Sequence, residues 1–144
     1  MKLNNNYKIL VTGGAGMIGS NLVKKLVNDG FETFVADNLW RGKKEYLFSD
    51  KEKMVIPDKN FYQVDLRDYE NCLRVTKDVN LVVHLADIVA GINYVFANES
   101  SVFRSNILIN SNILRACITN KVEKYIYAGT ACSYPKSKQT TLNP

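Results

Sequence analysis

The sequence predicts an α/β fold built on a doubly wound parallel sheet of about five strands, with helices on both faces. Short apolar runs alternate with longer segments of helical periodicity, the first run ends in a cluster of glycines, and no internal repeat interrupts the alternation. Strands that are apolar throughout are typical of a parallel sheet covered on both faces. Right-handed crossovers then favour the strand order 3-2-1-4-5.

Each element is expected from its own pattern. Buried strands are expected at residues 7–11, 31–37, 60–65, 81–86 and 124–129. Helices are expected at residues 17–29, 69–76 and 98–120. Gly30 follows the first helix as a stop signal, and Asp68 precedes the second as a cap. The polar stretch 38–59 is expected to be a long irregular loop, a kind of loop that often carries function.

Helical spacing also predicts which side chains face the core. In the first helix they are Ile18, Leu22, Val23 and Leu26. In the last helix they are Ile107, Ile109, Ile113, Leu114 and Cys117. His84 is the only histidine and lies within an apolar strand, so we expect it to be buried and structural.

The bulk composition limits the classes of function. A chain of 144 residues fits one domain, so residues 1–144 are expected to form a single unit. Cys72, Cys117 and Cys132 are widely spaced and predict neither a disulfide framework nor a metal site. The absence of a signal peptide and of an apolar run near about 18 residues favours a cytoplasmic protein outside the membrane. The net charge of +5 is scattered without an arginine-rich face, so by itself it supports an anionic small ligand about as well as nucleic acid. Nucleic acid is not among the expected partners.

The segment "VTGGAGMIGSNL" places three glycines between the first strand and the first helix. Gly13 permits a tight turn, Gly16 lets the backbone approach a pyrophosphate, and Gly19 allows the helix to pack closely. The helix N-terminus offers free N–H groups and a partial positive charge to phosphates, so the backbone at Met17 and Ile18 is included in the predicted site. Because the glycines follow a strand and open a helix, they predict a Rossmann-type dinucleotide-binding domain.

Asp37 ends the second strand, a position where a carboxylate accepts the hydroxyls of an adenosine ribose and repels a 2′-phosphate. It therefore favours NAD over NADP, with Asn38 beside it in the site. A carboxylate that caps a turn is the alternative interpretation. Arg41 and Lys43 keep NADP open, because a nearby cation accommodates the extra phosphate.

Further candidate positions follow from the strand ends, which point at the ligand crevice in this architecture. Asp65 and Leu66 close the third strand and are expected to flank the adenine, although turn capping is an alternative role for Asp65. The segment after the fourth strand is expected beside the pyrophosphate and the nicotinamide ribose. It contributes the candidate residues Leu85, Ala86 and Asp87, and the last helix contributes Asn106.

From about residue 7 to residue 139 the chain resembles the NAD-dependent epimerase/dehydratase family, which are extended short-chain dehydrogenases/reductases. The resemblance rests on the TGxxGxxG turn, "ADNL", "VDLRD", "VVHLA" and the Thr/Ser-rich end of the fifth strand. The segments "HLADIVAGI" and "AGTACSYPKSKQ" are most similar to GDP-mannose 3,5-epimerases. GDP-fucose synthases share a similar Cys-x-Tyr-Pro segment, and "DNLWRGKKEYL" is similar to UDP-sugar 4-epimerases. A GDP- or UDP-sugar is therefore the implied substrate.

The resemblance implies two catalytic residues. Thr130 matches the family's Ser/Thr, whose hydroxyl bonds the sugar 4-oxygen, and Cys132 matches a cysteine that acts as acid/base at a sugar carbon. Transient oxidation at C4 acidifies the neighbouring C–H bonds, and a thiol of lowered pKa can then move a proton. A small buried thiol is the alternative interpretation of Cys132. Ala90 stands where the family usually has Gly, which bears on the fit of the sugar.

Tyr134 and Lys138 have the Tyr-x-x-x-Lys spacing of the family's catalytic pair but are expected to be a look-alike. The family pair lies farther along, on the helix after the fifth strand. Here Pro135 disfavours helical angles at Tyr134, so the stretch is expected to be a loop. The catalytic helix and the substrate domain are thus expected to be absent from this chain.

Three hypotheses follow. The first is the N-terminal NAD-binding part of a nucleotide-sugar epimerase, which binds cofactor but has little turnover alone. The second is a non-catalytic dinucleotide-binding module. The third, a nucleic-acid binder, would require tight binding with a steep salt dependence. Without the next helix, we also expect an apolar patch over the fourth and fifth strands, or a homo-oligomer that hides it.

Overall fold

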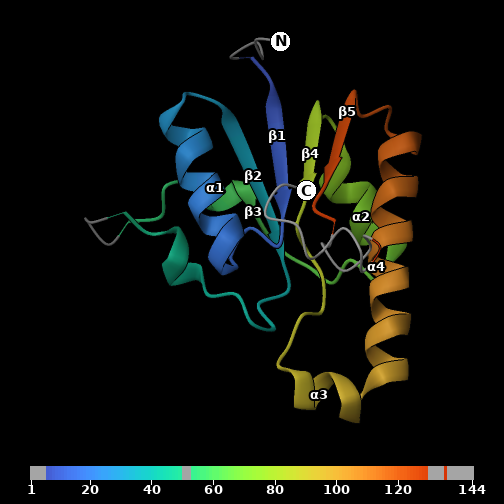
Figure 1. Ribbon diagram of the computed structural model, residues 1–144. Helices are drawn as coiled ribbons and strands as arrows, with labels where there is room; N and C mark the ends of the chain where they lie inside the picture. Colours follow the sequence, from blue (N-terminus) through green and yellow to red (C-terminus); the bar gives the residue numbers. More distant parts are fainter. Residues whose placement is uncertain (1–5, 50–52, 130–134, 136–144) are drawn as a thin grey trace.

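The computed structural model describes residues 6–49, 53–129 and 135, and its five-stranded sheet confirms the expected α/β class (Figure 1). The strands are β1 (Lys8–Thr12), β2 (Glu32–Asp37), β3 (Phe61–Gln63), β4 (Leu81–His84) and β5 (Lys124–Tyr127). The helices are α1 (Met17–Asn28), α2 (Tyr69–Thr76), α3 (Ile92–Ala97) and α4 (Glu99–Thr119). All four strand pairs are parallel, in the expected order β3-β2-β1-β4-β5.

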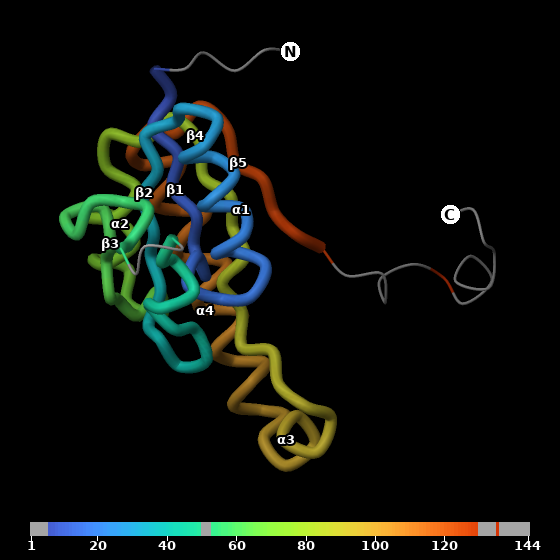
Figure 2. Tube along the Cα trace, turned by 90° about the vertical axis from the view of Figure 1, so that its left-hand side faces the viewer, coloured from blue at the N-terminus to red at the C-terminus, as the bar shows by residue number. Residues whose placement is uncertain are grey.

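The sheet separates two hydrophobic cores, because successive side chains of a strand point to opposite faces. Ile9 and Val11 of β1 pack on one face with Val23 of α1. Leu10 packs on the other face with residues of α2 and α4, including Cys72 and Ile113. Helices therefore cover both faces, as the sequence predicted, and Figure 2 shows α3 projecting from the body at one end of α4.

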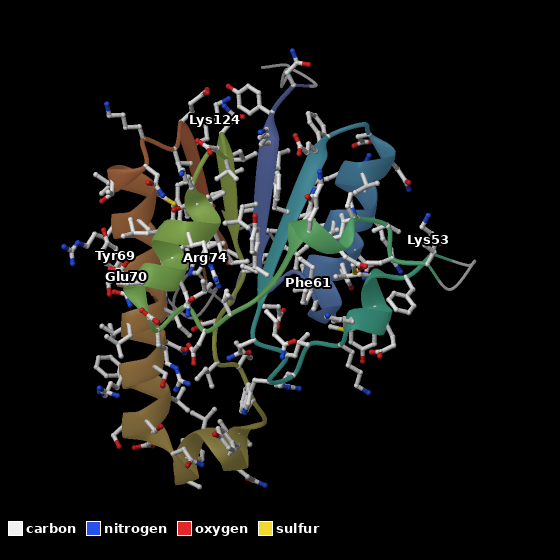
Figure 3. The ribbon with its side chains drawn as sticks, turned by 180° about the vertical axis from the view of Figure 1, so that it is seen from behind. Lys53, Phe61, Tyr69, Glu70, Arg74 and Lys124 are labelled. Atoms are coloured by element: carbon white, nitrogen blue, oxygen red, sulfur yellow. The ribbon has the colours of Figure 1, made fainter. Side chains whose placement is uncertain are left out.

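Tyr69 joins the two helices that share a face. Its hydroxyl lies 3.1 Å from Thr119 Oγ1, and the guanidinium of Arg115 lies 4.3 Å from the centre of its ring. Figure 3 shows Tyr69 at the start of α2, beside α4. Asp68 caps α2 as expected, because its side chain accepts a hydrogen bond from Glu70 N at 3.0 Å.

The last expected helix is confirmed within one residue at each end, but part of its expected inward face is wrong. A separate helix, α3, precedes α4, which begins at Glu99. Ile109, Ile113 and Cys117 are buried at a four-residue spacing, whereas Ile107 and Leu114 lie off this row and are about half exposed. Apolar residues surround much of α4, so periodicity alone fits more than one face.

The expectation that Ile18 faces the core is also wrong, because 70% of the residue is exposed. The face of α1 that meets the sheet is formed by Gly19, Ser20 and Val23. The close approach of α1 to the glycine turn leaves room there for small side chains only, so the bulky Ile18 points outward from the first helical turn.

The stretch 38–59 is more ordered than the expected irregular loop. It contains the short 3-10 helix η1 (Lys44–Leu47), and a second one, η2 (Asp58–Asn60), leads into β3. Leu47 and Ile56 are buried in the same core as α1. Within the described part of the chain, no helix combines the length and the apolar character that a membrane span requires.

Candidate functional site

A pocket lies at the carboxyl ends of β1, β2, β3 and β4, where a doubly wound sheet places its ligands. Many residues predicted for the cofactor line it: Gly13, Gly16, Asp37, Asn38, Asp65, Leu66, Leu85, Ala86 and Asp87. Trp40, Gly42 and Ile88 also line it and were not expected from the sequence, and Arg41, which was expected only as a cation that could accept a 2′-phosphate, lines it too. Met17, Ile18, Gly19 and Asn106 are predicted residues outside the lining.

The glycine turn packs backbone against backbone. Gly13 has a φ of +67°, and a Cβ there would lie 2.9 Å from the backbone nitrogen of Ala86. A Cβ on Gly19 would lie 2.2 Å from the carbonyl oxygen of Gly13. Side chains at these positions would push β1, α1 and the exit of β4 apart, so glycine is required to keep the turn closed.

The N-terminus of α1 opens at this turn without a side-chain cap. Gly16 is the N-cap residue, and the first turn of α1 carries no acidic side chain. Met17 and Ile18 belong to this turn and are exposed. The unpaired N–H groups and the helix dipole therefore favour an anion here. The site is open to a ligand phosphate, which the side chains of the first turn leave unblocked.

Asp37 connects the tip of β2 to the glycine turn. Its Oδ2 accepts a hydrogen bond from Ala15 N at 3.0 Å, and its Oδ1 accepts one from Leu39 N at 2.8 Å. Only 8% of the residue is exposed, yet it lines the pocket. A carboxylate oxygen can accept a second hydrogen bond besides the one that each oxygen of Asp37 accepts here. The turn-capping geometry and a remaining acceptor toward the pocket thus coexist in one side chain.

Asp65 is held by Arg67. The Asp65 carboxylate accepts the Arg67 backbone N–H at 2.9 Å and pairs with the guanidinium at 2.5 Å. The side-chain hydrogen bond from Arg67 lowers the pKa of Asp65, against partial burial that raises it. The geometry expected of a turn cap is therefore present, in a residue that also borders the pocket.

The segment after β4 forms the opposite wall of the pocket. Leu85, Ala86 and Asp87 line the pocket there, and partial burial raises the pKa of the Asp87 carboxyl. Asn106 lies behind this wall, where its side chain accepts from Ile88 N at 2.8 Å and donates to Ile88 O at 3.2 Å. Asn106 of α4 thus fixes the position of this wall through its two hydrogen bonds to Ile88.

Two contacts join the loop after β2 to the segment after β4. The rings of Trp40 and Tyr94 lie 5.7 Å apart, and Arg41 donates a hydrogen bond to the carbonyl of Val89. Gly42 lets this loop approach the glycine turn, since a Cβ there would lie 3.0 Å from Ala15. The sequence signal was the unusual length of this loop, which could not show where each residue would lie.

His84 is buried, as the sequence predicted, with 1% of it exposed. Its ring bonds Thr12 and Asn110, and burial lowers its pKa to about 4. The predicted catalytic residues Thr130 and Cys132 lie outside the described residues, as do Tyr134 and Lys138. Thr130 is three positions beyond the end of β5 in the sequence.

Among solved structures, the fold resembles the UDP-glucose 4-epimerase of Thermus thermophilus, determined in complex with NAD. The TM-score is 0.72 and the identity 37%, over 85% of this chain and 37% of that chain. A second similar structure is UDP-N-acetylglucosamine 4-epimerase from Methanobrevibacter ruminantium, in complex with UDP-N-acetylmuramic acid. Its TM-score is 0.79 and its identity 28%, over 95% of this chain and 42% of that one.

Relatives by sequence include GDP-mannose 3,5-epimerase of Arabidopsis thaliana, which is 35% identical over 93% of this chain and 33% of its own length. A putative UDP-glucose 4-epimerase of Methanocaldococcus jannaschii is 34% identical over 85% of this chain and 37% of its own length. The chain thus spans about a third of these curated relatives. The sequence model of the NAD dependent epimerase/dehydratase family matches residues 9–144, and the chain belongs to that family.

Proposed function

We propose that this chain is the NAD-binding part of a nucleotide-sugar epimerase. The observation that carries the proposal is one pocket that joins an uncapped helix N-terminus to a carboxylate at the tip of β2. The first arrangement suits a diphosphate, and the second suits a ribose with free hydroxyls. The backbone from Gly13 to Gly19 forms a phosphate cradle in this proposal. Its close packing has no room for a Cβ at Gly13 or Gly19, so glycine at both positions keeps the cradle closed.

Each part of the ligand has proposed partners. The pyrophosphate would be bound by the backbone from Gly13 through Gly19, the adenosine ribose by Asp37 and Asn38, and the adenine between Asp65 and Leu66. The wall at Leu85–Asp87 would lie beside the nicotinamide ribose. When bound, NAD supplies a hydride acceptor for the sugar C4 position. The chain itself binds and orients the dinucleotide and excludes water from the pocket floor.

NAD is proposed over NADP because of two features. Asp37 would place a negative charge beside a 2′-phosphate, and its carboxylate is fixed in place by Ala15 N and Leu39 N. Arg41, one of the two cations that would favour NADP, donates a hydrogen bond to the carbonyl of Val89 in the segment after β4.

Calorimetric titration with NAD and NADP tests the cofactor proposal. The Asp37→Asn variant is expected to bind NAD about tenfold more weakly and to lose most of its preference over NADP. Asp58→Asn is the matched control, because it removes the same charge from an exposed residue of η2. A wild-type chain that binds NADP as tightly as NAD would contradict the proposal.

A GDP- or UDP-sugar is the proposed substrate of the whole protein, of which this chain would form the N-terminal part. The named relatives support this proposal, among them a GDP-mannose 3,5-epimerase and UDP-glucose 4-epimerases. Thr130 and Cys132 keep the roles that the resemblance implies, at the sugar 4-oxygen and as acid/base. A GDP-fucose synthase-like reaction remains the alternative for the Cys132 segment.

Because the chain spans a third of its relatives, we expect it to bind NAD with little or no turnover when isolated. In this respect it would behave as a dinucleotide-binding module. Assays of the isolated chain with GDP-mannose and UDP-glucose measure this, and robust epimerisation would contradict it. An in-frame Tyr-x-x-x-Lys encoded downstream would support the epimerase over a purely binding role. A cytoplasmic location and a homo-oligomer stay predictions.

A further inference from the structure

A buried chain of hydrogen bonds runs from β1 through β4 to α4. Thr12 Oγ1 lies 2.6 Å from Nδ1 of His84, and Nε2 of the same ring lies 3.0 Å from Asn110 Oδ1. The amide nitrogen of Asn110 then donates to the carbonyl of Asn106 at 2.8 Å. Thr12 and His84 are almost fully buried, so water does not compete for these bonds.

The backbone fixes the direction of this chain. Thr12 Oγ1 accepts hydrogen bonds from the N–H groups of Leu85 and Ala86, each at 3.2 Å. A hydroxyl has one proton and two acceptor lone pairs, so its proton is left for Nδ1 of His84. The ring must then carry its own proton on Nε2, which donates to Asn110 Oδ1. The neutral Nε2–H tautomer satisfies every group.

The same bonds place one wall of the pocket. Leu85 and Ala86 both line the pocket, and Ala86 N lies 2.9 Å from where a Gly13 Cβ would be. Leu85 N has a second acceptor in the Thr12 carbonyl at 3.2 Å. For Ala86 N, the Thr12 hydroxyl is the acceptor that the structure shows. The position of Ala86 beside the glycine turn therefore depends on the Thr12 hydroxyl.

We propose that His84 is a positioning residue of the nucleotide pocket, whose neutral Nε2–H form fixes the Thr12 hydroxyl and, through it, Ala86. This inference rests on the proposed NAD binding. A ring protonated on both nitrogens would donate to Thr12 Oγ1, which would then face three donors with two lone pairs. The bond from Ala86 N would weaken, the wall would loosen, and the nucleotide would bind less tightly.

The surroundings of the ring keep it neutral in the native protein. On the β5 side, the His84 ring faces the phenol rings of Tyr125 and Tyr127, whose centroids lie 5.9 Å and 6.0 Å from its own. Burial raises the pKa of Tyr125, so that phenol carries no charge. β1 contributes Thr12 and α4 contributes Asn110, and among the described residues no charged side chain shifts the pKa of the ring.

In an Asn110→Asp variant, the affinity for NAD is expected to depend on pH. The carboxylate still accepts from Nε2–H, but its charge raises the pKa of His84 toward neutrality. We expect the Kd for NAD to rise about tenfold in this variant between pH 8 and pH 6, the effect of one lost buried hydrogen bond. The wild type and the exposed control Asn28→Asp are expected to show no such rise.

Two readouts do not need the nucleotide. His84 is the only histidine, so its ring nitrogens give one set of signals in a nitrogen-15 spectrum, expected from the Nε2–H tautomer. The hydrogen-exchange protection factor of the Ala86 amide is expected to fall in Asn110→Asp as the ring becomes protonated. A wild-type Nδ1–H tautomer, or a protonated variant with unchanged Ala86 protection, would overturn the inference. Failure of the wild type to bind NAD would instead overturn the proposed function.

Discussion

The Asp37 carboxylate accepts the backbone N–H of Ala15 at 3.0 Å, which ties the tip of β2 to the glycine turn after β1. The residue that would select the ribose therefore also helps to hold the phosphate cradle. Cofactor preference and cradle geometry are coupled in one side chain. A change at Asp37 is expected to alter both, so the ratio of NAD to NADP affinity is the quantity that isolates its effect on cofactor preference.

Gly19→Ala is expected to destabilise the fold. Its Cβ would lie 2.2 Å from the carbonyl oxygen of Gly13, a backbone atom that moves only with the whole turn. Overpacking of this kind costs about 1–3 kcal/mol. Urea unfolding of the variant measures the loss. Gly91→Ala is the control, because its added Cβ would meet no atom of the described residues within 4 Å apart from its chain neighbours, and an equal loss there would contradict the packing argument.

The buried His84 is expected to make stability depend on pH. Its pKa of about 4 in the folded chain lies below the ordinary 6.5, so the unfolded chain takes up the proton first as pH falls. Stability is therefore lost between about pH 6.5 and pH 4, by about 3 kcal/mol for a shift of this size.

Unfolding midpoints at pH 7.5 and pH 4.5 measure this loss against a His84→Gln variant. The variant is expected to be less stable at pH 7.5 because it breaks the bonds to Thr12 and Asn110. Its further loss between the two pH values should be smaller than that of the wild type, since it has no imidazole to titrate. Parallel pH curves for the two proteins would contradict burial as the cause.

Trp40 is the only tryptophan in the chain and lines the pocket, so its fluorescence is expected to report ligand binding. Its ring lies 5.7 Å from that of Tyr94 and is 47% exposed. Addition of NAD is expected to change its emission with the same Kd that calorimetry gives. Trp40→Phe removes the signal and serves as the control for inner-filter effects. An emission unchanged at saturating NAD would place the ligand away from this loop.

The outer row of α4 is expected to drive self-association. Phe103, Ile107, Leu114 and Ile118 are 45–72% exposed and share one side of the helix by their spacing. Soluble monomers rarely expose a continuous apolar patch of this kind. We expect sedimentation to show a concentration-dependent dimer that Ile107→Lys and Ile118→Lys disrupt. Glu99→Lys, an exposed change at the start of α4, is the control. A monomer in the wild type at all concentrations would contradict the prediction.

The sequence also predicts an apolar patch over β4 and β5, and β5 carries exposed side chains. Ile126 of β5 is 52% exposed, and Tyr127, which is 53% exposed, points to the opposite face of the strand beside His84. In the register of the sheet Ile126 pairs with Val83, which packs in the core on the α1 side. Among the described elements, α1 packs mainly on β1, β2 and η1, so α1 contributes little cover to this side of β5.

The sheet could be predicted from the sequence because its strands are short apolar runs bounded by glycine or acidic residues. The order of strands follows from crossover handedness and needed no knowledge of side chains. The turn at Gly13 was predictable for the same reason, since a strand, a glycine cluster and a helix follow one another directly. These features depend on local sequence, where propensity and pattern agree.

What escaped prediction depends on contacts between distant segments. The place of Trp40 and Arg41 in the pocket comes from contacts with Tyr94 and Val89, which lie far along the chain. Asn106 is a predicted site residue, whereas in the structure its side chain bonds the backbone of Ile88 behind the pocket wall. From the sequence alone, an asparagine whose side chain bonds the backbone cannot be told from one whose side chain bonds a ligand.

Leu47 and Ile56 are anchored in the core beside α1, so the connection from β2 to β3 occupies the position of a crossover helix without being one. A regular helix would allow changes of length only by whole turns if its packed face is to be kept. Here Leu47 and Ile56 are two separate anchors, and lengthening the chain between two anchors costs little closure entropy. Natural variation in this family is therefore expected to accumulate there, where new contacts with a bound ligand can arise at little cost to folding.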